Sequence, residues 1–120
     1  MTEEITLVIH GVESTEEIPG IAQIKDHAHI HCAPDLETLQ CYLPSAEALL
    51  GWNFRATELR QAWPLADRLR WIQWGGAGVD AVLFPELVAS DVLLTNARGV
   101  FDRAMAEYTL ALILAFGKEL

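Results

Sequence analysis

The residues of this chain best placed to do chemistry form a glycine-rich turn after a short apolar run. Trp71–Trp74 leads directly into Gly75-Gly76-Ala77-Gly78. Glycine tolerates positive φ, and because it has no Cβ it lets a ligand approach the main chain. Successive main-chain N–H groups in such a turn can bind a carboxylate or a phosphate. The N–H groups of Gly76, Ala77 and Gly78 are therefore a candidate anion site, although the same spacing also fits a tight turn that binds nothing.

The same glycines partly match the dinucleotide-binding fingerprint G-x-G-x-x-A. Gly76, Gly78 and Ala81 occupy its three fixed positions. The fingerprint requires a helix that starts directly at the loop, and Pro85 leaves little room for one. It also requires a carboxylate at the end of the next strand to bind the ribose, where this chain has Thr95-Asn96. The sequence therefore favours a small carboxylate over a nucleotide as the ligand of this loop.

Other groups of potentially catalytic residues are weaker candidates. His27, His29 and His31 alternate, so on a strand all three could share one face and hold a zinc ion. No carboxylate or cysteine stands at a matched ligand spacing, which favours partly exposed histidines and predicts no metal site. No serine has the flanking glycines of a nucleophile elbow.

Alternating strand-like and helix-like segments must position these residues. The apolar, β-branched run Ile5–Ile9 predicts a buried first strand. Ser14 and Glu17 fit a capping box and Pro19 fits a first helical turn, so the next helix is placed only loosely, at 16–27. Asp35 is a candidate N-cap for the helix after the second strand. The other predicted segments are strands at 28–33, 48–52, 69–74 and 92–95, helices at 36–43, 57–67 and 101–120, and a loop with at most one helical turn between the last two strands. This alternation predicts an α/β fold with a doubly wound parallel sheet.

The last predicted helix carries apolar residues on two sides. A surface helix needs one apolar stripe, so two stripes indicate cover on both sides. The domain itself can supply one cover, and we expect the second from a partner or from self-association through 101–120; the alternative is a helix wrapped by its own domain. Glu107 lies on neither stripe and is either a solvated charge or a contact to that partner. The stripes are Phe101, Met105, Tyr108, Leu112, Ala115 and Phe116 on one side, and Ala106, Leu110, Ile113, Leu114 and Gly117 on the other.

Composition and charge argue against several classes of partner. With 120 residues, 52% of them hydrophobic, the chain is long enough for one domain with a single core. A net charge of −9 repels nucleic acid and anionic lipid. No apolar run approaches the roughly 20 residues of a membrane span, and the acidic start Met1-Thr2-Glu3-Glu4 is unlike a signal peptide. We therefore expect a cytoplasmic protein in which Cys32 and Cys41 stay reduced.

Three sequence blocks, taken together, resemble the D-isomer-specific 2-hydroxyacid dehydrogenases. They are Leu69–Asp80 (LRWIQWGGAGVD), Ser90–Gly99 (SDVLLTNARG) and Ala106–Phe116 (AEYTLALILAF). The blocks occur in the order and spacing of that family. Within it, the chain is most similar to the glyoxylate/hydroxypyruvate reductase branch, and the resemblance covers residues 47–120.

This resemblance implies a flavodoxin-like substrate-binding (catalytic) domain at 1–100 and an interdomain hinge helix at 101–120. In the family a Rossmann domain that binds NAD or NADP follows, together with the catalytic arginine and histidine–acid pair, and none of these has a counterpart in this chain. We therefore expect no catalytic residue here, no cofactor bound by this chain alone and no activity from it alone. Its implied role is the substrate-binding portion of an enzyme that interconverts 2-keto acids and D-2-hydroxy acids of the glyoxylate/hydroxypyruvate type.

The resemblance also assigns roles to individual positions. Main-chain N–H groups of the family's glycine loop hold the substrate carboxylate, which implies that role for Gly76, Ala77 and Gly78. Trp52 matches an aromatic residue that lines the pocket in the reductase branch. Met105 falls where the hinge helix passes the nicotinamide. The implied partners are a small 2-keto or 2-hydroxy acid and the missing Rossmann domain.

A stand-alone flavodoxin-like binding or receiver module is the alternative. A phospho-receiver needs an acidic cluster at the ends of the first and third strands, where this chain has His10-Gly11 and Trp52-Asn53. A flavin module needs a phosphate-binding loop after the first strand, and His10–Glu13 is acidic and poor in glycine. Both features favour the dehydrogenase.

Overall fold

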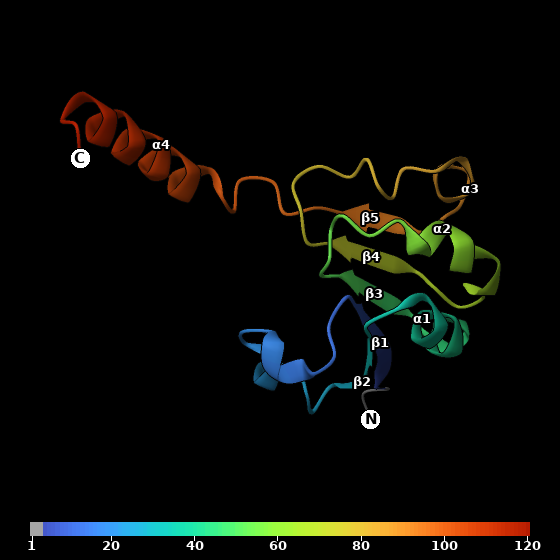
Figure 1. Ribbon diagram of the computed structural model, residues 1–120. Helices are drawn as coiled ribbons and strands as arrows, with labels where there is room; N and C mark the ends of the chain where they lie inside the picture. The colour runs from blue at the N-terminus through green and yellow to red at the C-terminus, as the bar shows by residue number, and fades with distance from the viewer. Residues whose placement is uncertain (1–3) are drawn as a thin grey trace.

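Five parallel strands form one sheet in the order β2-β1-β3-β4-β5, shown in Figure 1. The computed structural model describes residues 4–120; the first three residues of the acidic start, on which the signal-peptide argument rests, lie outside the described residues. The strands are β1 (Ile5–His10), β2 (Ala28–Ala33), β3 (Ala48–Gly51), β4 (Trp71–Trp74) and β5 (Leu93–Thr95), and the α-helices are α1 (Leu36–Tyr42), α2 (Glu58–Ala62), α3 (Pro85–Val88) and α4 (Asp102–Gly117). This order is that of flavodoxin-like doubly wound sheets, so the predicted fold class is confirmed.

The main core lies between the sheet and helices α1, α2 and α3. Because β1 lies between β2 and β3, right-handed crossovers place these three helices on one face of the sheet. Val8, Leu49 and Ile72 point toward them from neighbouring, registered strands and are fully buried. Asp35 caps α1 as predicted, since its carboxylate accepts a hydrogen bond of 2.9 Å from the Thr38 amide.

The connection between β1 and β2 covers part of the opposite face with two short 3₁₀ turns, Thr15–Glu17 and Ile21–Gln23. The helix predicted at 16–27 is therefore wrong, although Ser14 and Glu17 do form the predicted capping box. Pro19 lacks an N–H donor and Gly20 has a φ of 79°, which interrupts any continuous helix at this point.

The helix predicted at 57–67 is also shorter than expected. The α-helical part, α2, ends at Ala62 and continues as a 3₁₀ turn, Trp63–Leu65. Pro64 is the cause, because it cannot donate the backbone hydrogen bond that would extend the helix. Strand positions were predicted to within two residues of those observed.

The half of this second face that lies over β4 and β5 has no cover in the described chain. Trp71 is 42% and Leu93 61% exposed, although both side chains stand on a sheet face that such a fold normally buries. A hollow of about 360 Å³ runs beside them. Its lining includes Ile5, Leu7, Ile24, Ala48, Leu50 and Trp71.

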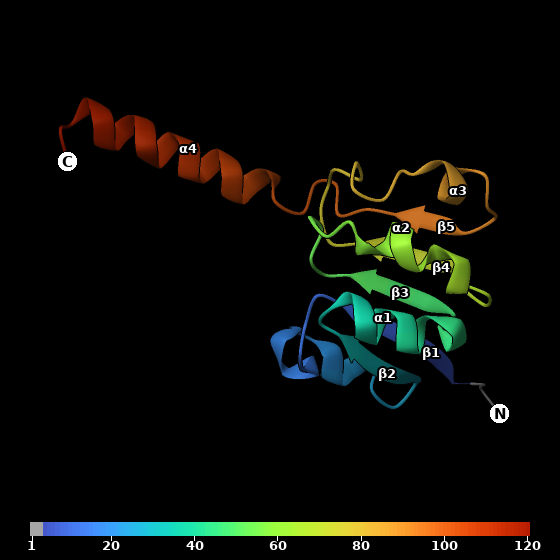
Figure 2. The ribbon, with the colours of Figure 1, turned by 45° about the vertical axis from the view of Figure 1, so that its right-hand side comes forward.

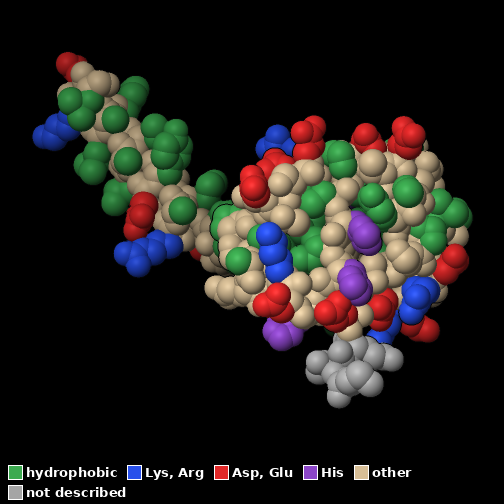
Figure 3. Space-filling model, turned by 90° about the horizontal axis from the view of Figure 1, so that it is seen from below, with side chains coloured by type: hydrophobic (Ala, Val, Ile, Leu, Met, Phe, Trp, Pro, Cys, Tyr) green, Lys and Arg blue, Asp and Glu red, His purple; other side chains and the backbone are tan. Residues whose placement is uncertain are grey.

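Helix α4 projects from the body of the molecule, as Figures 1 and 2 show. None of its residues is buried, so the domain covers neither apolar stripe and the expectation that it covers one is wrong. Figure 3 shows hydrophobic side chains along the length of this helix. Within residues 4–120, no helix combines the length and the apolar character needed to cross a membrane.

Candidate functional site

The glycine loop follows β4 at the carboxyl edge of the sheet, beside the end of β3. The Gly75 N–H donates to the Gly51 carbonyl at 2.9 Å, and a Cβ at Gly75 would lie 2.7 Å from the same oxygen. A Cβ at Gly76 would lie 2.9 Å from the Phe54 ring. None of the loop glycines has a positive φ, so the predicted use of that conformation is wrong. The first two glycines instead permit close approach to neighbouring atoms.

Two carbonyl groups of the loop are held by the residues that follow β5. The Ala97 N–H donates to the Gly76 carbonyl at 3.0 Å, and the Asn96 Nδ2 donates to the Ala77 carbonyl, also at 3.0 Å. All described peptide bonds are trans, so each N–H points opposite to the carbonyl of its own peptide unit. The N–H groups of Ala77 and Gly78 therefore both point away from residues 96–97.

These two N–H groups are free to bind a ligand. Within residues 4–120, neither Ala77 nor Gly78 donates its N–H to a protein acceptor, and both residues are exposed. Gly76 also lacks such an acceptor among these residues, but it is buried beside Phe54. The structure thus brings the three predicted residues together and leaves two of them accessible to an anion.

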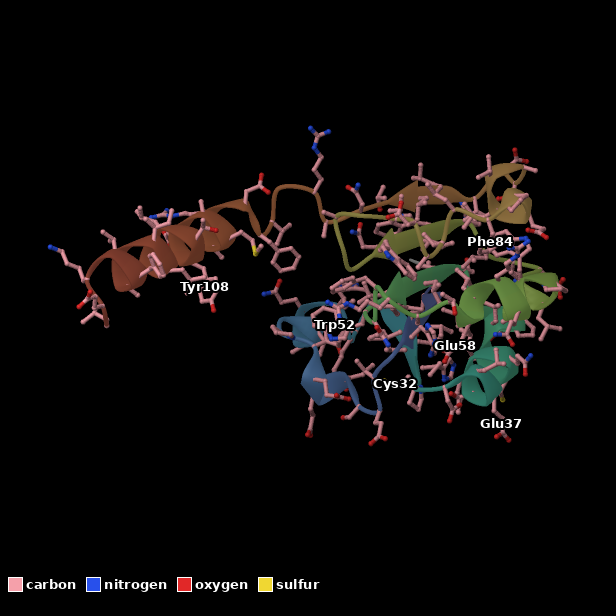
Figure 4. The ribbon with its side chains drawn as sticks, turned by 45° about the horizontal axis from the view of Figure 1, so that its top comes forward. Cys32, Glu37, Trp52, Glu58, Phe84 and Tyr108 are labelled. Carbon is pink, nitrogen blue, oxygen red and sulfur yellow. The ribbon has the colours of Figure 1, made fainter. Side chains whose placement is uncertain are left out.

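An apolar cleft of about 530 Å³ opens between the ends of β3 and β4 and the segment that leads to α4. Trp52, which the sequence resemblance assigns to the substrate pocket, lines this cleft and is 41% exposed. Figure 4 shows Trp52 at the end of the sheet from which α4 departs. Gly75 belongs to the lining, whereas Gly76, Ala77 and Gly78 do not, so the free amides lie two and three residues beyond the wall of the cleft along the chain.

Charged groups of both signs lie near the loop. The Arg55 guanidinium carbon lies 5.8 Å from the centre of the Phe54 ring, which itself packs against Gly76. A carboxylate oxygen of Asp80 lies 3.9 Å from the position that a Cβ on Gly78 would take. Asp80 therefore opposes the binding of an anion at Gly78, and Arg55 favours it.

The point between β1 and β3, where the strand order reverses, is closed. Ligands of doubly wound folds commonly bind there. In this chain the amides of Trp52 and Asn53 both donate to the His10 carbonyl, and a Cβ at Gly11 would lie 2.5 Å from the Asn53 Cβ. The open cleft lies one strand further along, beside the predicted loop.

Sequence reasoning missed a buried pair at this edge. His10 is 1% exposed, and its Nε2 lies 2.5 Å from the Glu58 Oε2 on α2. Among the described residues, its Nδ1 has no partner. Figure 4 labels Glu58, which comes from the helical face of the sheet; the pair takes no part in lining the cleft. It joins β1 to α2, and no local pattern in the sequence signals a contact between residues 48 positions apart.

The other candidates lie apart from the loop. His31 stacks on Tyr42 with ring centres 4.4 Å apart, and His29 pairs with Glu4 at 2.9 Å. No group of metal-ligating side chains occurs in the part of the chain that the structure describes. Met105 is 64% exposed on the first turn of α4. Glu107 pairs with Arg103 on the exposed helix surface at 2.8 Å.

Both cysteines are free thiols, with Cys32 half-buried and Cys41 exposed. Burial raises the pKa of the Cys32 thiol, and the negative charge of Glu17 raises this pKa further. A raised pKa keeps a thiol protonated and poorly nucleophilic. Cys32 therefore does not have the properties of a nucleophilic cysteine.

The residues of the loop do not fit a dinucleotide. The fingerprint positions Gly76, Gly78 and Ala81 are followed by turns, and the next helix, α3, begins only at Pro85 and ends at Val88. No helix therefore begins at this loop, and its N–H groups lack the helix N-terminus that binds the pyrophosphate in dinucleotide-binding folds. No catalytic step through nicotinamide can be derived from these residues.

The fold defines a flavodoxin-like α/β domain with an open cleft at the carboxyl edge of its sheet. Comparison with solved structures relates it to a D-isomer-specific 2-hydroxyacid dehydrogenase family protein from Aeromonas salmonicida. The two share 25% sequence identity with a TM-score of 0.78, over 98% of this chain and 37% of that one. The predicted resemblance to this family is confirmed at the level of structure.

A second solved structure, a protein from Pyrococcus horikoshii, shares the fold at 20% identity with a TM-score of 0.67. The match covers 95% of this chain and 34% of the Pyrococcus protein. The chain thus spans about a third of the length of both structures. No protein-family model matches the chain, and no curated protein matches it.

Proposed function

We propose that this chain is the substrate-binding portion of an NAD(P)-dependent oxidoreductase that interconverts 2-keto acids and D-2-hydroxy acids. The observation that carries the proposal is the pair of N–H groups of Ala77 and Gly78, which both point away from residues 96–97 and have no acceptor within residues 4–120. The similarity to a 2-hydroxyacid dehydrogenase family protein supports the same chemistry.

In this proposal the loop anchors the substrate carboxylate. Two N–H groups on neighbouring peptide units can each donate to one carboxylate oxygen, and such charge-assisted hydrogen bonds are stronger than neutral ones. Anchoring the carboxylate fixes the orientation of the adjacent keto carbon, which is what a positioned hydride donor requires. Glyoxylate and hydroxypyruvate are the acids that the sequence blocks suggest for this anchor.

The remaining assignments belong to the same proposal. A Rossmann domain outside this chain binds NAD or NADP and carries the catalytic groups, so the 120-residue chain alone is inactive. Met105 contacts the nicotinamide when α4 serves as the hinge helix between residues 1–100 and that domain. The exposed apolar surface of α4 supports a covering partner, either that domain or a second copy of the chain. The location proposed for the protein is the cytoplasm.

Titration of the ¹⁵N-labelled chain with glyoxylate, followed by NMR, tests the proposal. We expect the amide signals of Ala77 and Gly78 to move in a saturable way, while that of Gly20, an exposed glycine in a remote turn, stays in place. FMN and NADH serve as competing ligands that represent the alternative, a flavodoxin-like binding module. Tight binding of either cofactor by the chain alone, or unmoved loop amides, would contradict the assignment.

A charge variant sharpens this test. Two unit charges about 6 Å apart interact by about 0.7 kcal/mol in water, so Asp80→Asn should tighten glyoxylate binding about threefold at low salt. The matched control is Glu86→Gln, which removes a carboxylate on α3 instead. Because salt screens exposed charges, the gain at Asp80 should shrink as ionic strength rises.

A further inference from the structure

We propose that the substrate of this site is a 2-keto or D-2-hydroxy acid with an apolar side chain, branched or aromatic, which occupies the cleft between the ends of β3 and β4. This inference rests on the proposed function, because the carboxylate of the same molecule must lie at Ala77 and Gly78. It departs from the glyoxylate/hydroxypyruvate expectation, which concerned acids with no side chain or with a hydroxymethyl group.

The size and lining of the cleft carry the inference. Its volume of about 530 Å³ lies in the range of small-molecule sites, roughly 300–1,000 Å³. Glyoxylate has no side chain and would leave this space filled with water. The apolar side chains that line the cleft are those of Leu50, Trp52, Phe54, Val100 and Phe101.

The polar residue of the cleft, Gln73, has its amide engaged within the protein. Its Nε2 donates to the carbonyls of Trp74 and Asn96, both at 3.1 Å, and its Oε1 accepts from the Thr95 hydroxyl at 2.6 Å. A hydroxyl on the substrate side chain would have to break these bonds to gain a partner there. Apart from the Trp52 indole N–H, the lining therefore offers little to the hydroxymethyl group of hydroxypyruvate.

The lining also lacks charge. It contains no Lys, Arg, Asp or Glu side chain. A second carboxylate on the substrate would enter an apolar space without a counter-ion, which is unfavourable. The site therefore disfavours dicarboxylic keto acids as well as hydroxylated ones.

The expected preference follows from the area buried. Burial of one methylene group favours binding by about 0.8 kcal/mol, which is roughly fourfold. Because the cleft is open on one side, we take about half of this for each carbon of an isobutyl group. The acid 4-methyl-2-oxopentanoate should then bind about tenfold more tightly than glyoxylate.

NMR titration of the full 120-residue chain separates the two parts of the site. Glyoxylate should move the amides of Ala77 and Gly78 alone, whereas 4-methyl-2-oxopentanoate should move these amides and the Trp52 indole signal, at about one tenth of the concentration. The ketone 4-methyl-2-pentanone, which lacks the carboxylate, should move the Trp52 signal alone. Hydroxypyruvate should bind no better than glyoxylate.

The outcomes distinguish this inference from the proposed function. If the acids move the loop amides but bind equally well whatever their side chain, the side-chain assignment is overturned and the carboxylate anchor stands. If no acid moves the loop amides, the proposed function fails, and with it this inference.

A matched pair of tryptophan variants provides the control. Trp52→Ala should reduce the preference, measured as the ratio of the affinities of this variant for 4-methyl-2-oxopentanoate and glyoxylate, from about tenfold to about threefold. Trp71→Ala removes a tryptophan of the same exposure from the opposite end of β4, outside this cleft, and should leave the preference intact. Equal effects of the two variants would overturn the assignment of the side chain to this cleft.

Discussion

Substitution of Gly75 by alanine should destabilise the protein far more than the same change at Gly78. An added Cβ at Gly75 would lie 2.7 Å from the Gly51 carbonyl oxygen and 3.1 Å from that of Trp52. Both atoms belong to the backbone and cannot rotate away. At Gly78 the nearest atom is the Asp80 carboxylate oxygen, 3.9 Å distant. The two glycines therefore differ in steric environment, although the sequence gives them equal weight.

The cost at Gly75 can be worked from these contacts. Overpacking of a well-packed site costs about 1–3 kcal/mol. Relief of the clash also stretches the hydrogen bond from the Gly75 N–H to the Gly51 carbonyl, worth about 0.5–1.5 kcal/mol. We therefore expect Gly75→Ala to lower the free energy of unfolding by about 2–4 kcal/mol, and Gly78→Ala to change it by less than about 0.5 kcal/mol.

Urea unfolding, followed by tryptophan fluorescence, measures this difference. For a domain of this size the slope m is about 1–3 kcal/mol per molar urea, so the midpoint of Gly75→Ala should fall by about 1–2 M. Gly76→Ala should lie between the two, because the clash there is with the Phe54 side chain, which can move. Equal midpoints for the Gly75 and Gly78 variants would refute the close-approach explanation of this loop.

Three further outcomes are expected. Glu58→Ala should destabilise the chain by about 1–3 kcal/mol in the same urea assay, because it leaves the buried His10 ring without its partner, while Glu58→Gln, which keeps an acceptor, should cost less. Hydrogen bonds from the Thr38 backbone and side chain lower the pKa of Asp35 below its ordinary 3.8, so its stabilising effect is complete above 3.8 and is lost as the pH falls through the lower folded-state value. Melting curves at several pH values should show that Asp35→Asn, which keeps the cap, is less sensitive to acid over that interval than the parent chain. Sedimentation at high concentration should show self-association of the parent chain and a monomer for the double variant Leu110→Glu, Ile113→Glu, with unchanged circular dichroism because α4 buries no residue; a monomeric parent would contradict the pairing of α4.

The strands were predictable because parallel strands are usually covered on both faces, so that each one is a short apolar run in the sequence. Runs such as Ile5–Ile9 are rich in apolar and β-branched residues. This pattern can be recognised without knowing which strands are neighbours in the sheet. The Asp35 cap was predictable for a similar reason, since its hydrogen bond reaches only three residues along the chain. Local signals of this kind fix the order and type of most elements.

The missed features depend on residues distant in sequence. Whether Gly75 needs a positive φ or a close approach is decided by Gly51, the last residue of β3, and by Trp52, which follows it. The contact between His10 and Glu58 likewise depends on how α2 is placed over β1. The turn after β4 was predicted from its glycines, but the hydrogen bonds by which Asn96 and Ala97 orient its amides join residues far apart in the sequence, and no local pattern indicates them. Substrate binding at this loop stays a prediction.

The hydrogen bonds from Asn96 and Ala97 have a consequence for how this chain can be altered. Two residues beyond Ala97 the backbone turns at Gly99, with a φ of 86°, and α4 starts at Asp102. An inserted or deleted residue between Thr95 and Ala97 would shift the donors off Gly76 and Ala77 and rotate both peptide planes. Length changes after Arg98 would leave those planes where they are. A changed linker or a new C-terminal module is therefore tolerated when it is joined after Arg98, but not when it alters the chain between Thr95 and Ala97.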